Sequence, residues 1–258
     1  MVTVVPLQIG LGGKLYVDNR DIKISKLPLS ARDGLDPQVR PPDPVEFGRI
    51  MAEVGQNCDE IIAILLSGHL NPAVHFAQEA AATGYSPVTV HVVDSQTTGA
   101  GLGLLVQAAA EAASFGMSPV EIKQLLHGLV PHVYTIFCMQ SLTYLAHSVK
   151  IDVAQALVGE MLGVIPILVL ENGRLMPIQK ARTPRHLVDI FHEFISEFGQ
   201  LRHVALMQGM PPYAHEARAL RERISTDYPY TPYTEHTLGA ALATILGPRS
   251  MGVVAMEK

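Results

Sequence analysis

The sequence of 258 residues contains no tryptophan, and aromatic residues make up only 6% of it. Proteins that bind single-stranded nucleic acid stack bases on aromatic side chains, and nucleic-acid-binding proteins in general carry a basic surface. Here 24 acidic residues outnumber 19 basic ones, which gives a formal net charge of −5. The composition therefore argues against nucleic acid as a partner.

Cysteine is also scarce, since Cys58 and Cys138 are the only two in the chain. They are far apart and form no Cys-x-x-Cys pair, and the His-Glu-x-x-His pattern of zinc enzymes is absent. These absences argue against a disulfide scaffold and against a zinc site. Sparse cysteine is typical of a reduced compartment, so we expect a cytoplasmic protein without a metal.

No apolar run is long enough to cross a bilayer. The most apolar stretch, residues 161–170, is broken by Gly163 and Pro166, whereas a membrane-spanning helix needs about 20 apolar residues. Residues 1–13 are apolar but lack the basic residues and the cleavage site of a signal peptide. We therefore expect no stable membrane insertion.

Apolar residues are plentiful, at 48% of the chain, and the most informative run is residues 61–66. It is short enough for a strand buried on both faces. A turn follows from Ser67-Gly68, and Asn71-Pro72 starts a helix, because Asn is a favoured N-cap and Pro suits the first helical position. Such a unit can hold an anion at its helix N-terminus, or it is one βα unit among several and binds nothing.

Strands and helices alternate through the first half of the chain. Short connections between them predict a parallel, Rossmann-like sheet with right-handed crossovers. Capping boxes begin two of the helices, at Asp43 and Ser118. The predicted strands are residues 2–9, 14–17, 61–66, 88–93 and 133–138, and the predicted helices are 43–54, 71–77, 99–115 and 118–127.

The second half has a different pattern, which predicts a mixed sheet and a second α/β domain. Asn172-Gly173 lies between two apolar runs and is a strong hairpin signal. We place the domain boundary near residue 148, giving domains 1–148 and 149–258. Predicted helices are 141–146, 152–162, 183–198 and 214–224, and predicted strands are 165–170, 174–180, 203–208, 250–256 and 238–246, the last with a helix as the alternative.

No set of residues predicts an active site. The glycines of residues 99–103 are spaced wrongly for a dinucleotide fingerprint, so close helix packing explains them better. His186 and His192 fall on opposing sides of one predicted helix and are poor metal co-ligands. Ser67 is in no G-x-S-x-G elbow, and no histidine is placed beside it. An enzyme that uses the helix start at Asn71 for an anionic substrate is therefore the least favoured hypothesis.

The order of several short motifs resembles the DegV family of bacterial fatty-acid-binding proteins across nearly the whole chain. No single motif decides this, but their shared order makes the resemblance specific. The motifs are VVPL at 4–7, GGKLYVD at 12–18, DPVEF at 43–47, the strand and helix of 64–77, VVDS at 92–95 with Gly101 and Gly103, LTYL at 142–145, PIL at 166–168, NG at 172–173, KART at 180–183, and Gly247-Pro248 with Gly252.

The resemblance implies a two-domain α/β fold that carries a long-chain fatty acid. In such proteins the tail lies in an apolar tunnel between the domains, and polar groups at a helix start hold the carboxylate. The carrier presents that carboxylate to a separate fatty acid kinase and performs no chemistry itself. We therefore expect a binding protein with a fatty acid ligand, a kinase partner and no cofactor.

This chain departs from the family pattern where the carboxylate is held. The family's threonine falls on Val39, its serine on Asn71, its glycine on Pro72 and its histidine on Ile245. The side chains of Val39 and Ile245 contain no hydrogen-bond donor, and proline lacks a backbone N–H. A hydrogen bond to a charged group contributes roughly 1.5–3 kcal/mol, so losing two or three weakens carboxylate binding by orders of magnitude unless other donors substitute.

Two hypotheses follow from these departures. The first is a lipid carrier with an altered head-group site, in which burial of the tail still contributes ~0.8 kcal/mol per CH₂. The second is a scaffold or interaction module that no longer binds fatty acid. For the first, the expected fatty-acid-binding positions are Ser67, Gly68, Asn71, Ala73, Val39 and Ile245.

Overall fold

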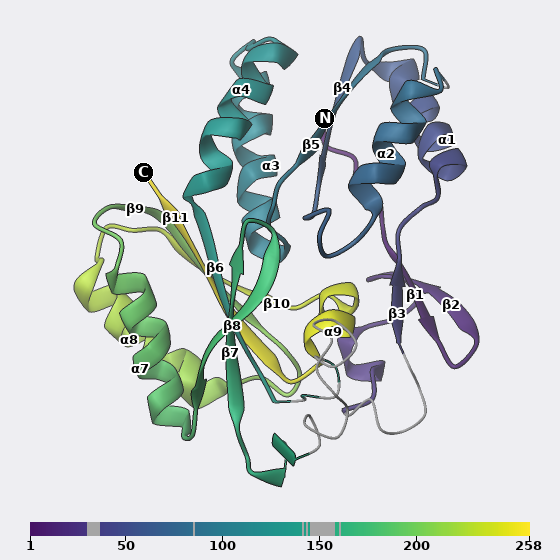
Figure 1. The fold of residues 1–258 in the computed structure, drawn as a ribbon. Coiled ribbons are helices and arrows are strands. Elements are labelled where there is room, and N and C mark those ends of the chain that lie inside the picture. The colour runs from purple at the N-terminus through teal and green to yellow at the C-terminus, as the bar shows by residue number, and fades with distance from the viewer. Residues whose placement is uncertain (30–36, 85, 141, 143, 145–157, 160) are drawn as a thin grey trace.

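The computed structural model describes residues 1–29, 37–84, 86–140, 142, 144, 158–159 and 161–258. These residues form an α/β fold with a small antiparallel sheet, a parallel pair of strands and a six-stranded mixed sheet (Figure 1). A parallel and a mixed sheet were both expected, so the fold class is confirmed. The predicted boundary at residue 148, and most of the predicted helices 141–146 and 152–162, lie outside the described residues.

The small sheet has the order β2-β1-β3, with β1 Gln8–Leu11, β2 Lys14–Val17 and β3 Gln38–Arg40. Gly12 and Gly13 connect β1 to β2 with φ angles of 56° and 76°, which glycine adopts without steric cost. The prediction of a strand over residues 2–9 is wrong in its first part, because pairing begins only at Gln8. Pro6 has no N–H to offer a neighbouring strand, and Val4 is 82% exposed.

The parallel pair consists of β4 Glu60–Leu65 and β5 Thr89–Asp94. The helices of this part are α1 Pro44–Val54, α2 Ala73–Ala82, α3 Gly99–Ser114 and α4 Pro119–Leu129. Both predicted helix starts with caps are confirmed: Glu46 N–H donates to the Asp43 side chain (2.8 Å), and Ser118 with Glu121 forms a capping box. These bonds satisfy N–H groups that a helix start leaves without an intrahelical partner.

The six-stranded sheet has the order β10-β9-β11-β6-β7-β8. We predicted that the strand near residues 133–138 would extend the parallel sheet, and this is wrong: β6 pairs antiparallel with both β7 and β11. An apolar run marks a buried strand but does not identify its partners. The strands are β6 Val133–Met139, β7 Ile165–Glu171, β8 Arg174–Ala181, β9 Leu201–Gln208, β10 Tyr233–Thr237 and β11 Ser250–Glu257.

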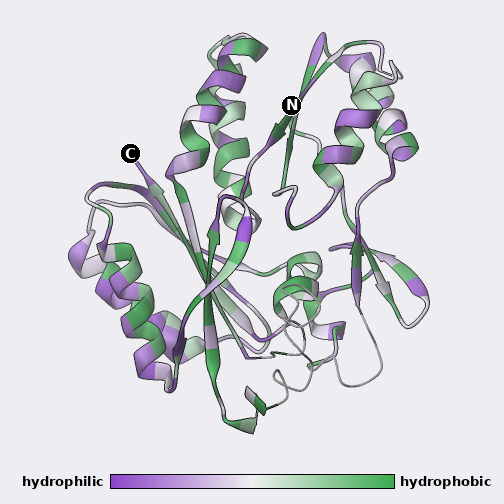
Figure 2. Ribbon diagram, in the orientation of Figure 1, coloured by the Kyte–Doolittle hydropathy of each residue, from purple (hydrophilic) through white to green (hydrophobic). Residues whose placement is uncertain are grey.

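Helices cover both faces of this sheet (Figure 1). On one face, α7 Pro184–Ser196 and α8 Ala214–Asp227 bury Phe191 and Leu220 against the strands. On the other, α3 and α9 Ala240–Leu246 bury Leu105 and Leu246 in a second core. Figure 2 shows hydrophilic residues interspersed with hydrophobic ones on α7 and α8, whereas α9 is mainly hydrophobic. The outer layer is thus amphipathic and α9 is enclosed.

Residues 240–246 form a helix, so the predicted strand over 238–246 is wrong and the helical alternative is right. Most of this helix is buried, including Ala240, Ala243 and Leu246. A helix that is apolar on all sides lacks the 3.6-residue alternation that identifies amphipathic helices, which explains the error. Its first turn is held from far away in the chain, because Ala240 N–H donates to Asp18 Oδ1 (3.0 Å).

No helix among the residues with assigned structure is both long and apolar enough to cross a membrane.

Burial raises the pKa of the Asp18 carboxyl above its ordinary value of 3.8, although backbone N–H groups of Ala241 and Ala240 oppose that shift. The folded state therefore favours the protonated acid. The contribution of Asp18 to stability is greatest below its ordinary pKa and falls as the pH rises through the raised value.

Replacing Asp18 tests its contact with α9. Asp18→Ala leaves Ala240 N–H without its acceptor and should lower the free energy of unfolding by about 1 kcal/mol, as for other lost helix caps. Asp18→Asn keeps an oxygen acceptor without a charge, so its stability relative to wild type should rise as the pH increases through the raised pKa of Asp18. Urea denaturation measures both. Asp59→Ala, at an exposed position, is the control and should change little; an equal loss there would contradict the assignment.

Candidate functional site

A pocket of about 640 Å³ lies among α3, α9, β9, β10 and the N-terminal segments. We call it the α3–α9 pocket. Its volume lies within the range of roughly 300–1,000 Å³ that is typical of small-molecule sites. Most of its wall is apolar. The apolar side chains that line it include Leu7, Val39, Leu66, Met207, Leu242 and Ile245.

The start of α3 forms one wall of the pocket through a close approach to β9. Gly99 has a φ of +56°, and a Cβ there would lie 2.6 Å from Met207 Sδ and 3.2 Å from Leu242 Cδ2. The next residue, Ala100, donates its N–H to the same sulfur (3.3 Å). A side chain at Gly101 would collide with Thr97. Close packing against neighbouring atoms therefore explains the glycines at positions 99 and 101.

Polar side chains gather on the wall formed by β9 and β10. His203 Nε2 and His236 Nε2 each lie 2.9 Å from Thr234 Oγ1. Burial lowers the pKa of the His203 imidazole, and the neighbouring His236 lowers it further. We call His203, Thr234 and His236 the imidazole cluster.

Two of the predicted site residues, Val39 and Ile245, line the α3–α9 pocket. The other four, Ser67, Gly68, Asn71 and Ala73, do not line it, although the adjacent Leu66 does. Their assignment to the ligand site stays a prediction. Their hydrogen bonds show which of their polar groups already have partners inside the protein.

Asn71 and Gly68 use their polar groups within the β4–α2 connection and its neighbour β5. Asn71 Oδ1 accepts from the N–H of Ala73, the first residue of α2 (2.9 Å), but the N-cap position is Pro72, so the predicted N-cap at Asn71 is wrong by one residue. Gly68 N–H donates to the Asp94 carboxylate (3.2 Å) at the end of β5. The backbone N–H groups of Gly68 and Ala73 therefore have intramolecular acceptors.

Ser67 is buried and holds the hairpin turn between β7 and β8. Its hydroxyl donates to Gly173 O (2.7 Å), and the same Oγ accepts from His69 N–H (3.2 Å). Gly173 has a φ of +78°, and a Cβ there would collide with Ser67 Oγ. The Asn-Gly signal thus marks both a tight turn and a docking point on Ser67.

No sequence pattern indicated the imidazole cluster. The sequence predicted a strand at residues 203–208 but none at residues 233–237, so Thr234 and His236 were not brought together with His203. The available signal was the spacing of Thr234 and His236, two residues apart, which puts both on one face of a strand. Polar residues in a charged stretch gave no reason to assign that strand.

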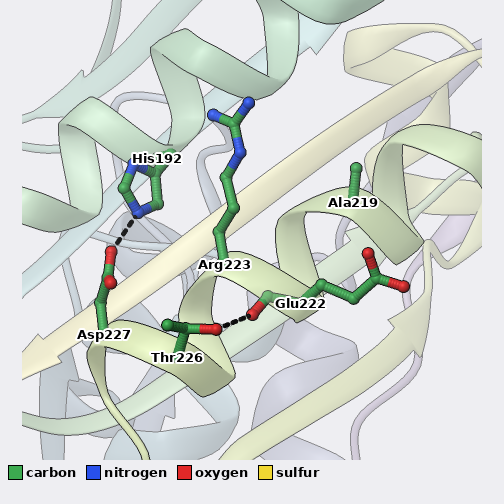
Figure 3. A pocket seen from close by; sticks show the side chains of 6 residues that line it. All are labelled: His192, Ala219, Glu222, Arg223, Thr226 and Asp227. Atoms are coloured by element: carbon green, nitrogen blue, oxygen red, sulfur yellow. Dashed lines mark hydrogen bonds and ion pairs between the residues drawn. The ribbon is translucent and has the colours of Figure 1, made fainter.

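Two other chemistries, a metal site and a reactive thiol, have no support among the described residues. Figure 3 shows His192 pointing at Asp227 on the neighbouring helix, and the two side chains lie 2.7 Å apart. Asp189 pairs with Arg223 (2.8 Å), and no group of three His, Cys, Asp or Glu suited to a metal occurs among the residues searched in the described part of the chain. Burial raises the pKa of the Cys138 thiol to about 12, so it stays protonated and unreactive near neutral pH.

Comparisons with known proteins agree with one another. Residues 1–258 match the family model described as "Uncharacterised protein, DegV family". A DegV domain-containing protein of Deinococcus radiodurans is 31% identical over 257 residues, covering 98% of this chain and 90% of the relative. One of Caldanaerobacter subterraneus is 29% identical over 262 residues, covering 100% of this chain and 92% of the relative.

Solved structures share the fold over almost the whole chain. One is described as fatty acid binding of a DegV family protein from Thermus thermophilus; it has a TM-score of 0.83 and 26% identity, with 98% of this chain and 91% of that chain covered. Another is the Streptococcus pneumoniae fatty acid kinase B3 protein loaded with linoleic acid. It has a TM-score of 0.84 and 17% identity, with 98% and 90% covered, which shows likeness of fold.

The Ser67–Gly173 contact can be tested with matched glycine variants. Gly173→Ala and Gly116→Ala both place alanine at a positive φ, of +78° and +82°, but only the first Cβ meets neighbouring atoms. The strain alone should cost about 1–2 kcal/mol, and the collision at Gly173 should cost at least about 1 kcal/mol more. Chemical denaturation gives both values. Equal losses for the two variants would mean that the turn does not press on Ser67.

Proposed function

Since this chain belongs to the DegV family, we propose that it is a carrier of long-chain fatty acids and holds the acyl chain in the α3–α9 pocket. The observation that carries the proposal is the largely apolar lining of a pocket of about 640 Å³. The solved relative from Thermus thermophilus is described as binding fatty acid. Neither that description nor the side chains of the pocket point to catalysis, so we propose a binding protein rather than an enzyme.

The acyl tail supplies most of the affinity in this proposal. At roughly 0.8 kcal/mol per buried CH₂, burying about ten methylenes contributes ~8 kcal/mol, which corresponds to micromolar binding before the costs of association. Val39 and Ile245 extend the apolar wall at positions where the family resemblance implies polar head-group residues. Their side chains favour retention of a tail and contribute nothing to a carboxylate.

A second candidate function is a scaffold that binds no fatty acid. Three observations favour it: the side chains of Val39 and Ile245 contain no hydrogen-bond donor, Asn71 Oδ1 accepts from Ala73 N–H, and the Ser67 hydroxyl donates to Gly173 O. Under this alternative the pocket remains without lipid in the purified protein and takes up none when fatty acid is added.

A fatty acid kinase is the protein partner that we propose for the carrier, and the cytoplasm is its proposed location. The resemblance implies that the kinase receives the carboxylate from the carrier and converts it to an acyl phosphate. Formation of acyl phosphate from ATP, a bacterial fatty acid kinase and carrier-bound palmitic acid tests this step. Equal formation without the carrier would argue against it.

Native mass spectrometry of the purified protein, followed by denaturing extraction of bound lipid, distinguishes the two functions. We expect a retained mass that matches a long-chain fatty acid. A different lipid would mean that the pocket serves another ligand. A lipid-free protein that also fails to bind added palmitic acid would refute the carrier function and support the scaffold.

Filling the pocket from α3 gives a direct test with a matched control. Gly103 lines the pocket, and a Cβ at Gly103 or at Gly128 of α4 meets no atom within 4 Å. Gly103→Phe should lower the affinity for palmitic acid by at least about 10-fold, or 1.4 kcal/mol, because the ring occupies the space of the tail. Gly128→Phe makes the same change on an exposed helix away from the pocket and should leave affinity unchanged. Equal affinities of the two variants would place the tail elsewhere.

A further inference from the structure

We propose that the imidazole cluster, His203, Thr234 and His236, is the carboxylate-binding site of this chain, so that the fatty acid head group lies against β9 and β10. The inference rests on the proposed carrier function. It differs from the expectation drawn from the family resemblance, which puts the head group at the β4–α2 connection. It assigns binding roles to three residues that neither the sequence motifs nor the predicted site includes.

Hydrogen-bond donors are unevenly distributed around the α3–α9 pocket. The walls from β3 and α9 present Val39 and Ile245, which have apolar side chains, whereas β9 and β10 present His203, Thr234 and His236. A carboxylate brought into an apolar environment without hydrogen bonds suffers a large loss of hydration. Among the lining side chains, the imidazole cluster combines several groups that can donate hydrogen bonds to an anion at one place.

The Thr234 hydroxyl can accept two hydrogen bonds and donate one. A hydroxyl has one proton and two lone pairs, and a neutral imidazole has one donor nitrogen, which can be either one. Both histidines place Nε2 at 2.9 Å from Thr234 Oγ1. When both carry their proton on Nε2, they donate to the two lone pairs, and the hydroxyl proton is free to be donated to a carboxylate. In that tautomeric state the cluster supplies a hydroxyl donor whose acceptor sites are filled by two imidazoles.

The charges that line the pocket and the exposure of His236 also favour this site. Asp18 is the acidic side chain of the pocket lining, and its Oδ1 accepts from Ala240 N–H, which commits it to α9. His236 is exposed and lies on β10, at the edge of the six-stranded sheet. An anion beside the two histidines would favour their protonated forms and so add attraction. A carboxylate held there would also lie close to solvent, where a partner could reach it.

The arrangement is set by strand register and not by a flexible loop. Parallel pairing of β9 and β10 puts Thr234 beside Ala205 and His236 beside Met207. His203, Ala205 and Met207 are two residues apart and share the face that lines the pocket. Thr234 therefore lies between the two imidazoles on a rigid sheet, and the donors are positioned before a ligand binds.

The test compares delipidated wild-type protein with Thr234→Val, which keeps the β-branched shape and removes the hydroxyl. Affinities for palmitic acid and for its methyl ester are measured by native mass spectrometry. We expect Thr234→Val to weaken palmitic acid about 10- to 100-fold, as for loss of a hydrogen bond to a charged group, and to leave the ester nearly unchanged. Thr89→Val, at an exposed position on β5, is the control and should bind both ligands like wild type.

A second measurement locates the head group directly. The carboxyl resonance of palmitic acid labelled with ¹³C at C1 should shift in His203→Gln and in His236→Gln, but not in Asn71→Ala. A shift confined to Asn71→Ala, or an unchanged ratio of acid to ester affinity in Thr234→Val, would overturn the inference while the carrier function stands. Failure of wild-type protein to bind either ligand would instead overturn the carrier function, and the inference with it.

Discussion

Burial of both faces of the six-stranded sheet is the constraint on which the rest of this structure depends. β11 lies inside that sheet, and its residues from Ser250 to Met256 are buried. Helices α7 and α8 cover one face, and α3 and α9 cover the other (Figure 1). α9 is short and mostly buried, so its first turn needs an acceptor from elsewhere, which Asp18 provides. The α3–α9 pocket is the space that this second layer leaves open against the sheet.

Competition for polar groups links the fold to the function. In a buried connection, each N–H and hydroxyl must find a partner, because an unpaired one costs free energy. Ser67 bonds to the β7–β8 turn, Gly68 to Asp94, and Asn71 to the start of α2. The bonds of Ser67 and Gly68 join segments that are distant in sequence, and the bond of Asn71 orders the start of α2, so the connection has a structural role in this chain. The same bonds reduce what it can offer to a ligand.

In the proposed carrier, affinity and orientation come from different parts of the pocket. The apolar wall sets how strongly an acyl chain is retained, because burial of methylenes scales with area and needs no particular direction. Polar groups set which end of the ligand goes where, because hydrogen bonds are directional. A chain whose family-pattern donors have become Val39 and Ile245 can therefore retain a tail while its head group turns to donors on β9 and β10.

The sequence by itself determined what depends on neighbouring residues: the capped starts of α1 and α4, the Asn172-Gly173 turn, and the order of motifs that indicated the family. The caps and the turn each depend on a bond or a backbone angle within about four residues, and the order of the motifs is a property of the sequence itself. The tertiary structure alone decided the partners of β6, the helical state of residues 240–246, and the meeting of His203 with Thr234 and His236. Strand pairing joins residues far apart in the chain, and a fully buried helix has no amphipathic period, so neither leaves a local signal.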